Sequence, residues 1–175
     1  PHTYREQEVQ AVTRAVRAGE CVSLIGLSGA GKSNLMGFLG YHLGQPAPAV
    51  KGRYHLIDCN RLTQPTTEAL FTLLASALEP QQPGSQTGTW EMLDQAIERS
   101  LQNTPGLCFL LDRFDALQES GGASARPDAL YSSLRALRDA HKYALTYVIA
   151  ARRPLDTHNE LAELFFAHTL WLGPL

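Results

Sequence analysis

A glycine-rich stretch near the start of the chain carries residue types that bind phosphate groups. It reads Gly26-Leu27-Ser28-Gly29-Ala30-Gly31-Lys32-Ser33. The spacing matches the pattern of Gly, any four residues, Gly, Lys and then Ser or Thr, which forms a loop around phosphate oxygens. Glycine allows positive φ angles and a close approach of the backbone to an anion, and successive N–H groups then form a concave site. We therefore predict that the residues of this loop bind the phosphates of a nucleotide.

The polar residues at the end of the loop would complete a site for ATP or ADP with Mg²⁺. The Lys32 ammonium would contact the β- and γ-phosphates. The Ser33 hydroxyl is a suitable ligand for Mg²⁺, which keeps water and phosphate at most of its other positions. Asn34 follows in the first turn of the expected helix, whose N-terminus adds a partial positive charge. The alternative is a glycine-rich turn that binds nothing.

The segments on both sides of the loop match what a phosphate-binding loop requires. Residues 21–25 are short and mostly apolar, as in a parallel strand that is buried on both faces. After the loop, apolar residues recur at helical spacing, at Leu35, Met36, Leu39 and Leu43. A strand, the loop and a helix thus follow one another in the order that this motif needs.

An acidic strand end later in the chain would supply the carboxylate that steadies the metal. The apolar residues 107–111 predict a buried strand, and Asp112 follows it directly. We expect Asp112 to bind Mg²⁺ through water, because the carboxyl ends of parallel strands border the ligand crevice; a turn Asp is the alternative. Asp115, three residues further on, is a candidate to orient the attacking water, and it is equally suited to cap a helix.

Strands and helices alternate along the whole chain. Apolar runs predict further strands over 54–59, 145–150 and 169–172. Apolar residues at helical spacing predict helices over 9–16, 67–78, 90–101, 130–137 and, as a short helix, 159–165. This alternation predicts an α/β fold in which helices cover both faces of a parallel sheet.

These motifs together resemble the AAA+/STAND branch of the P-loop ATPases, a group of signal-transducing and initiator-like switch proteins. The resemblance depends on the phosphate loop, on the sequence Asp112-Arg113-Phe114-Asp115 and on the arginines after the fourth strand, and it spans nearly the whole chain. It implies a P-loop NTPase fold, a three-layer sandwich with a five-stranded parallel sheet in the order 5-1-4-3-2. Residues 1–175 would then form a single ATPase core domain.

The resemblance also implies roles for residues near the ends of elements. Arg152, in preference to Arg153, would be the sensor that detects the γ-phosphate, because a guanidinium is planar and always charged; a surface arginine pair is the alternative. Tyr4 and Arg5 would border the adenine, although an ordinary helix start explains them equally well. Pro174, soon after the fifth strand, would touch the base.

Two departures from the family pattern bear on activity. Many related ATPases place a catalytic Glu directly after the metal-binding Asp, and here that position holds Arg113, which cannot accept a proton. We interpret the chain as a domain excised from a longer protein, and expect it to be separated from the helical lid and winged-helix region that usually follow such a core. We therefore expect weak binding and slow turnover. An arginine from a neighbouring subunit, for which Arg135 and Arg138 are candidates, would complete the site on assembly.

Composition narrows the classes of partner. Lys and Arg number 15 against 17 Asp and Glu, a formal net charge of -2, which gives no support to a broad nucleic-acid surface. The cysteines, three in number and without CxxC spacing, indicate buried thiols in a reducing compartment. No apolar run reaches the length of a membrane span. We expect a cytoplasmic protein that binds a nucleotide and either effector domains or further copies of itself, with no membrane partner.

Our main hypothesis is a STAND-like switch in which Mg-dependent ATP binding and slow hydrolysis control assembly or an effector domain. A DNA-associated initiator or transposition-type AAA+ ATPase shares the same core and is the first alternative. A pseudo-ATPase that binds nucleotide without turnover is the second, because Arg113 stands where the Glu is expected. A small-molecule kinase fits less well, since residues 119–126 hold one arginine where kinases carry an arginine-rich lid.

Overall fold

Helices and strands alternate through the part of the chain that the structure describes. A computed structural model describes residues 4–43, 53–79, 88–119 and 128–174 of the protein. In chain order the elements are α1 (Glu6–Arg17), β1 (Val22–Ile25), α2 (Lys32–Leu43), β2 (Arg53–Asp58), η1 (Cys59–Arg61), α3 (Thr67–Leu78), α4 (Trp90–Asn103), β3 (Leu107–Asp112), α5 (Asp115–Glu119), α6 (Asp128–His141), η2 (Lys142–Ala144), β4 (Leu145–Ala151), η3 (Glu160–Phe165) and β5 (Thr169–Trp171), where η marks a 3₁₀ helix.

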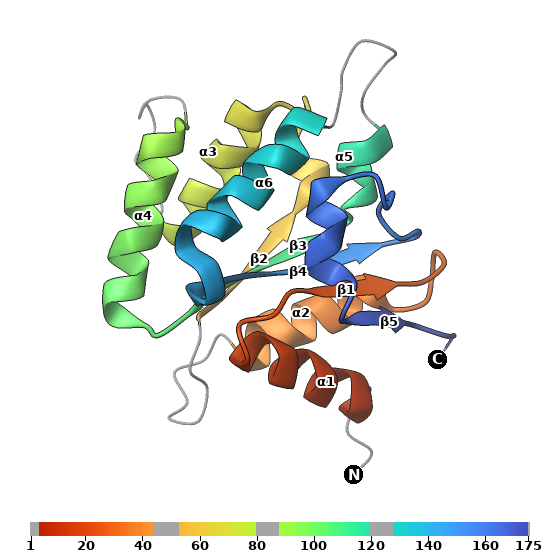
Figure 1. The fold of residues 1–175 in the computed structure, drawn as a ribbon. Coiled ribbons are helices and arrows are strands. Elements are labelled where there is room, and N and C mark those ends of the chain that lie inside the picture. The colour runs from red at the N-terminus through yellow and green to blue at the C-terminus, as the bar shows by residue number, and fades with distance from the viewer. Residues whose placement is uncertain (1–3, 44–52, 80–87, 120–127, 175) are drawn as a thin grey trace.

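The strands form a five-stranded, all-parallel sheet in the order β2-β3-β4-β1-β5 (Figure 1). Read from the other edge, this is the predicted order 5-1-4-3-2, which is confirmed. β4 lies between β1, which leads into the phosphate loop, and β3, which ends in Asp112. Because all strands run the same way, their carboxyl ends meet at one edge of the sheet, where parallel α/β folds place their ligands.

Different helices cover the two faces of the sheet, which gives the predicted three layers (Figure 1). α1 and α2 pack on one face, where Leu39 of α2 belongs to a core that also holds Leu110 of β3. α3, α4 and α6 cover the other face, where Leu134 of α6 shares a core with Phe109 of β3. Neighbouring residues of β3 thus point into opposite cores, as the alternation of side chains along a strand requires.

Local hydrogen bonds explain where several elements begin and end. The hydroxyls of Thr66 and Thr89 accept from the backbone N–H groups of Ala69 and Met92 at 3.1 and 3.3 Å, and so cap α3 and α4. The helix predicted over 67–78 is confirmed at both ends.

Other boundaries differ from the prediction by a few residues or in helix type. β2 gives way to η1 at Cys59, because the Asp58 carboxylate accepts from the backbone N–H of Asn60 at 3.0 Å and turns the chain. The predicted short helix over 159–165 is the 3₁₀ helix η3, whose first turn is capped by the Asn159 side chain. The last strand ends at Trp171, one residue earlier than predicted.

The three cysteines are free and buried, which confirms the prediction of buried thiols. Among the described helices, none combines the length and the apolar content that crossing a lipid bilayer requires.

Candidate nucleotide-binding site

A cleft of about 460 Å³ opens beside the phosphate loop, at the carboxyl end of the sheet. Residues from the loop, α2 and the ends of β2, β3 and β4 line it: Ser28, Gly29, Gly31, Lys32, Ser33, Asn34, Asn60, Asp112, Arg113, Asp115, Ala116 and Arg152. The structure therefore brings the predicted phosphate-binding, metal-binding and sensor residues to one cavity, although they come from segments far apart in the sequence.

The backbone of the loop has the conformation that an anion site needs. Gly29 and Gly31 have φ angles of 82° and 79°, in the left-handed region that favours glycine. A methyl group added at Gly29 would meet no other atom within 4 Å, so open space lies beside this residue. The N–H groups of Lys32, Ser33 and Asn34 belong to the first turn of α2, where no preceding helical carbonyl can accept them. The loop thus fits a phosphate group both in shape and in its donors.

Lys32 reaches back over the loop that it follows. Its Nζ atom donates to the carbonyl oxygens of Gly26 and Leu27 at 2.5 and 2.9 Å. Burial lowers the pKa of Lys32 from its ordinary value, while the nearby carboxylates of Asp115 and Asp112 act in the opposite direction. The ammonium is therefore held at the loop, close to two acidic residues of the cleft.

The oxygen ligands that the protein offers around the cleft suit Mg²⁺ better than they suit a metal ion that is coordinated by protein side chains alone. Asp112 is 8% exposed, and its Oδ1 atom accepts from the backbone N–H of Arg113 at 2.9 Å, which leaves further lone pairs on the carboxylate. Ser33 lines the same cleft. Within the described ranges no group of three or more His, Cys, Asp or Glu side chains is arranged so that it could hold a metal ion. One hydroxyl and one carboxylate match Mg²⁺, which takes its other ligands from water and phosphate.

Asp115 and Arg152 form a contact that was not expected from the sequence. Both carboxylate oxygens of Asp115 accept from the backbone N–H of Arg152 at 3.0 Å. The Nε atom of Arg152 lies 3.8 Å from Asp115 Oδ2, and the side chains are 49% and 15% exposed respectively. Asp115 therefore ties the start of α5 to the end of β4. Whether it also orients water stays a prediction, as does the sensor role of Arg152.

Arg152 and its neighbour Arg153 lie on different sides of the β4 end. Arg152 lines the cleft beside the phosphate loop. Arg153 is exposed and lines a separate cavity together with Asp128, Tyr131 and His158. Among the described residues, Arg152 lines the cleft and Arg153 does not, and the choice of Arg152 as the sensor stays a prediction.

Three residues of the cleft were given no role in the sequence analysis, namely Asn60, Arg113 and Ala116. Asn60 follows β2, and the shared direction of the strands could have placed it at the carboxyl edge. Arg113 has a φ of 53°, an uncommon left-handed conformation for a residue other than glycine. The backbone N–H of Phe114 donates to Ala150 O at 2.9 Å, and Phe114 itself is fully buried. This arrangement leaves Arg113 exposed at the cleft.

Other predicted binding residues lie around the loop and not in the cleft. Among the described residues, those that line the cleft include none of Tyr4, Arg5 and Pro174. The side chains of Tyr4 and Arg5 contact the backbone of the loop instead. Pro174 is exposed and follows Gly173, whose carbonyl accepts from Arg5 at 2.8 Å. Their contacts with the adenine or the base therefore stay predictions.

The remaining loop positions, Gly26, Leu27 and Ala30, do not line the cleft in the described part of the chain. A side chain at Gly26 would come within 2.8 Å of the Leu172 carbonyl oxygen, so glycine is required for packing against β5. The Leu27 side chain is 80% exposed. These three residues shape the loop, and a direct contact with nucleotide stays a prediction for each.

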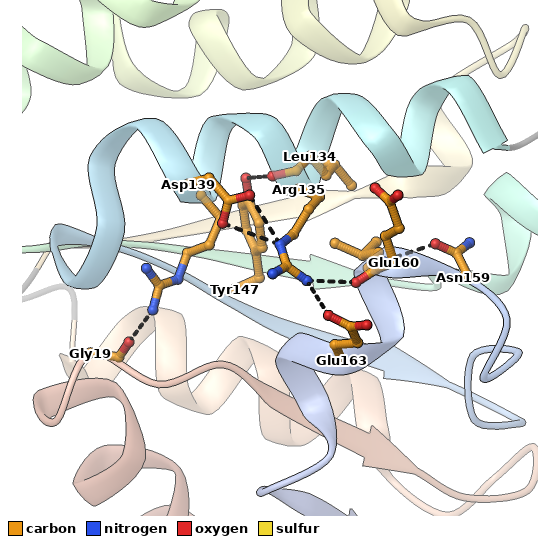
Figure 2. Close-up of polar contacts among 10 residues, drawn as sticks. Gly19, Leu134, Arg135, Asp139, Tyr147, Asn159, Glu160 and Glu163 are labelled. Atoms are coloured by element: carbon orange, nitrogen blue, oxygen red, sulfur yellow. Dashed lines mark hydrogen bonds and ion pairs between the residues drawn. The ribbon is translucent and has the colours of Figure 1, made fainter.

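The proposed arginine donors on α6 are engaged within the protein. Figure 2 shows Arg135 between Asp139 and η3: its Nη1 atom donates to the Glu160 carbonyl at 2.8 Å, and it pairs with Asp139 and Glu163 at 3.1 Å. Arg138 is buried, and it donates to the Gly19 carbonyl at 2.6 Å. Arg138 cannot reach a neighbouring subunit without breaking this contact, so its suggested role as an arginine donor to that subunit was wrong.

Comparison with known sequences identifies one family. A family model described as an AAA domain matches residues 16–157, an interval that includes the phosphate loop, Asp112, Asp115 and Arg152. Among curated proteins, no sequence matches this chain significantly.

Solved structures share the fold at low sequence identity. The Walker-type ATPase of Pyrococcus abyssi has a TM-score of 0.70 and 17% identity, over 98% of this chain and 54% of that chain. The ORC1 protein of Aeropyrum pernix, solved in complex with DNA, has a TM-score of 0.73 and 15% identity, over 100% and 47%. The ORC2 protein of the same organism, solved with ADPNP and ADP, has a TM-score of 0.72 and 14% identity, over 98% and 49%. This chain thus spans about half the length of the structures that it matches.

Proposed function

The chain belongs to the AAA domain family of P-loop ATPases, and from this premise we propose that it binds ATP with Mg²⁺ in the cleft and changes state according to whether the γ-phosphate is present. The observation that carries the proposal is the single cleft that joins Lys32, Ser33, Asp112 and Arg152. Each supplies a different part of a nucleotide triphosphate site: a cation, two metal ligands and a second cation at the far strand end.

The chemistry asks this chain mainly to position charges. Phosphoryl transfer needs little covalent help from the protein, so electrostatic stabilisation and alignment carry most of the catalysis. The amides at the start of α2 and the Lys32 ammonium would hold the phosphates. Ser33 and Asp112 would hold Mg²⁺, which supplies charge neutralisation at the phosphates when it is bound.

Hydrolysis by this site would be slow, because neither Asp112 nor Asp115, the acidic residues among the described residues that line the cleft, would be free to activate water. Arg113 follows Asp112, and a guanidinium cannot accept a proton. Asp115 lines the cleft, but both of its oxygens accept from the Arg152 backbone. Asp115 would therefore serve first to position Arg152, and turnover would rise only if assembly or a partner changes this contact.

Arg152 would report the nucleotide state to the rest of the domain. Its side chain is 49% exposed at the cleft, and its Nε atom lies 3.8 Å from Asp115 Oδ2. A γ-phosphate would compete for this guanidinium and shift the end of β4 and the start of α5 together. A shift of this kind needs a difference in binding free energy between the two states, and the contact with the γ-phosphate would provide it.

The hypothesis of an initiator-type AAA+ ATPase has more support than the hypothesis of a STAND-like switch. The structures that share this fold include ORC1 in complex with DNA and ORC2 with ADPNP and ADP. We therefore propose, as the second candidate, an initiator-type AAA+ module that acts beside DNA. The formal net charge of -2 argues that any DNA contact is local. For a signalling role, we propose that the nucleotide state controls an effector domain or self-association. We also propose a cytoplasmic location for the protein, in keeping with its buried thiols.

Calorimetric titration with ATP and ADP, each with Mg²⁺ and with EDTA, tests the proposed function. Wild-type protein should bind both nucleotides, and Lys32→Ala should lose at least tenfold in affinity, or about 1.4 kcal/mol. Arg14→Ala is the matched control, because Arg14 is an exposed cation on α1 outside the cleft. Equal affinities for wild type and Lys32→Ala would contradict the proposal.

A DNA titration separates the initiator-type candidate from a switch without DNA. Fluorescence anisotropy of a labelled duplex would be followed with Mg·ATP, with Mg·ADP and without nucleotide. Binding that depends on nucleotide and weakens with salt would support the initiator-type candidate. No anisotropy change in any condition, together with clear ATP binding, would argue against it for this chain.

A further inference from the structure

The carbonyl groups on the outer side of the phosphate loop are bound by two side chains from the start of the chain. The Nη2 atom of Arg5 donates to the Ala30 carbonyl oxygen at 2.8 Å. The hydroxyl of Tyr4 donates to the Gly31 carbonyl oxygen at 3.3 Å. Neither side chain is among the described residues that line the cleft. Both carbonyls are thus engaged by side chains outside the cleft. The Gly31 carbonyl also accepts from the backbone N–H of Leu35 in α2 at 2.9 Å, so Tyr4 supports an orientation that the helix already sets.

Because of peptide geometry, a contact that fixes a carbonyl group also fixes the direction of the N–H group in the same peptide. A trans peptide group is planar, and its C=O and N–H bonds point in opposite directions. The described part of the chain contains no cis peptide bond. Fixing the Ala30 carbonyl therefore fixes the direction of the Gly31 N–H, and fixing the Gly31 carbonyl does the same for the Lys32 N–H. These are two of the amides that would bind phosphate.

The Arg5 side chain is largely buried and contacts three separate segments of the protein. Its side chain is 8% exposed and pairs with Glu8 at 3.0 Å. The same Nη2 atom also donates to the Gly173 carbonyl oxygen at 2.8 Å, beyond β5. Arg5 precedes α1 with a φ of 45°, in the left-handed region. One guanidinium therefore connects α1, the phosphate loop and the segment after β5.

Two features of Arg5 are energetically unfavourable, and packing alone gives no reason for them. The Nε atom of Arg5 is buried and has no hydrogen-bond partner within the described part of the chain. Leaving a buried donor unpaired is unfavourable, and so is a left-handed residue other than glycine. Tyr4 is also held in place, because its ring packs 5.8 Å from the ring of Phe38 on α2. A functional role for the guanidinium at Ala30 accounts for both features.

We propose that Arg5, assisted by Tyr4, is a positioning residue that orients the Gly31 and Lys32 amides toward the phosphates of the nucleotide. The inference rests on the proposed function, since it assumes that the loop binds phosphate. A positive charge at the Ala30 carbonyl also polarises the peptide group and strengthens its N–H as a donor. The role differs from a contact with the adenine, because it acts on the phosphate end of the ligand.

Tripolyphosphate, which lacks a base and a sugar, separates the two roles. Arg5→Lys keeps the charge but not the planar fork, and Arg5→Ala removes both. We expect the affinity for ATP to fall about tenfold in Arg5→Lys and further in Arg5→Ala, as for the loss of a charged hydrogen bond. The affinity for tripolyphosphate should fall by the same factor. Tyr4→Phe keeps the ring beside Phe38 and should lose a smaller factor for both ligands.

Several results would overturn the inference. A loss for ATP with unchanged tripolyphosphate binding would place Arg5 at the base, and unchanged affinity for both would remove its role. Arg14→Ala, on the helix that Arg5 precedes, is again the control. Circular dichroism at the titration temperature would show that each variant is folded. If Arg5→Ala is unfolded, Arg5→Lys and Tyr4→Phe decide. If wild-type protein itself binds no ATP, the proposed function fails, and that outcome is distinct from a failure of this inference.

Discussion

Replacing Gly29 by alanine is the sharpest perturbation of the phosphate loop that the structure offers. Gly29 has a φ of 82°, and a methyl group there would meet no atom within 4 Å. Any effect of Gly29→Ala on the free protein therefore comes from backbone strain and not from a collision. Because Gly29 lines the cleft, the added methyl group would stand where the nucleotide approaches.

The strain sets the expected loss of stability. A left-handed conformation costs an L-residue other than glycine about 1–2 kcal/mol. For a domain of this size each kcal/mol lowers the melting temperature by about 2–4 °C, so we expect Gly29→Ala to melt roughly 2–8 °C below wild type. The alternative for the variant is to relax the loop, which would displace the amides that face the phosphate. In either case ATP affinity should fall by at least about tenfold, or 1.4 kcal/mol.

Gly37 provides the matched control for this prediction. It lies inside α2, and a methyl group there also meets no atom within 4 Å. Alanine is favoured over glycine inside a helix by about 0.5–1 kcal/mol, so Gly37→Ala should raise the melting temperature and leave ATP affinity unchanged. Thermal unfolding by circular dichroism and calorimetric titration would measure both quantities. A Gly29→Ala protein with wild-type melting temperature and wild-type ATP affinity would refute the reasoning.

Substitutions at the cleft and the reactivity of the buried thiols provide three further tests. Arg152→Ala should reduce the preference for ATP over ADP by about tenfold. Arg153→Ala, which alters a separate cavity, should leave this preference unchanged. Equal effects of the two substitutions on nucleotide affinity would show that Arg152 is not the sensor. Arg113→Glu should raise the ATP hydrolysis rate by at least about tenfold by adding a proton acceptor at the cleft, measured by phosphate release, and an unchanged rate would show that water is activated elsewhere. Burial raises the pKa of the Cys21, Cys59 and Cys108 thiols, that of Cys108 to about 12. Since the thiolate is the reactive form, Ellman's reagent at pH 8 should label them quickly only after denaturation, and fast labelling of native protein would contradict their burial.

The fold could be predicted because buried parallel strands are continuous apolar runs. β3 and β4, for example, are buried along their whole length and separate clearly from the helices beside them. The order of the strands, however, came from the resemblance to a family and not from the runs themselves. Boundaries that depend on one side-chain hydrogen bond, such as the turn that Asp58 makes at the end of β2, were displaced.

The candidate site was predictable where chemistry is local in sequence and less so where it depends on contacts across the fold. The spacing of the loop identified Lys32 and Ser33, and an apolar run identified Asp112. No local pattern could show that Asp115 would bind the Arg152 backbone, because these residues are distant in sequence and meet only when α5 packs at the end of β4. The same applies to Arg5, whose acceptor at Ala30 lies on another segment.

Arg138 illustrates the opposite error. It was a candidate donor to the site of a neighbouring subunit, yet its guanidinium is buried against the Gly19 carbonyl and lies 5.3 Å from the Tyr143 ring centroid. Sequence periodicity places the residue on the flank of α6 but does not show which neighbouring loop covers that flank. The buried charge is stabilised here by the Gly19 carbonyl, which is distant in the sequence, and by the nearby Tyr143 ring.

A crystal structure of this protein with Mg²⁺ and a nonhydrolysable ATP analogue would show whether the cleft binds the nucleotide as proposed. We expect the β- and γ-phosphates within hydrogen-bond distance of the Gly31, Lys32 and Ser33 amides, with the metal next to Ser33 and Asp112. The Lys32 ammonium should have left the Gly26 and Leu27 carbonyls that it now contacts for the phosphates. A nucleotide bound elsewhere, or a loop whose amides face away from the phosphates, would contradict the account.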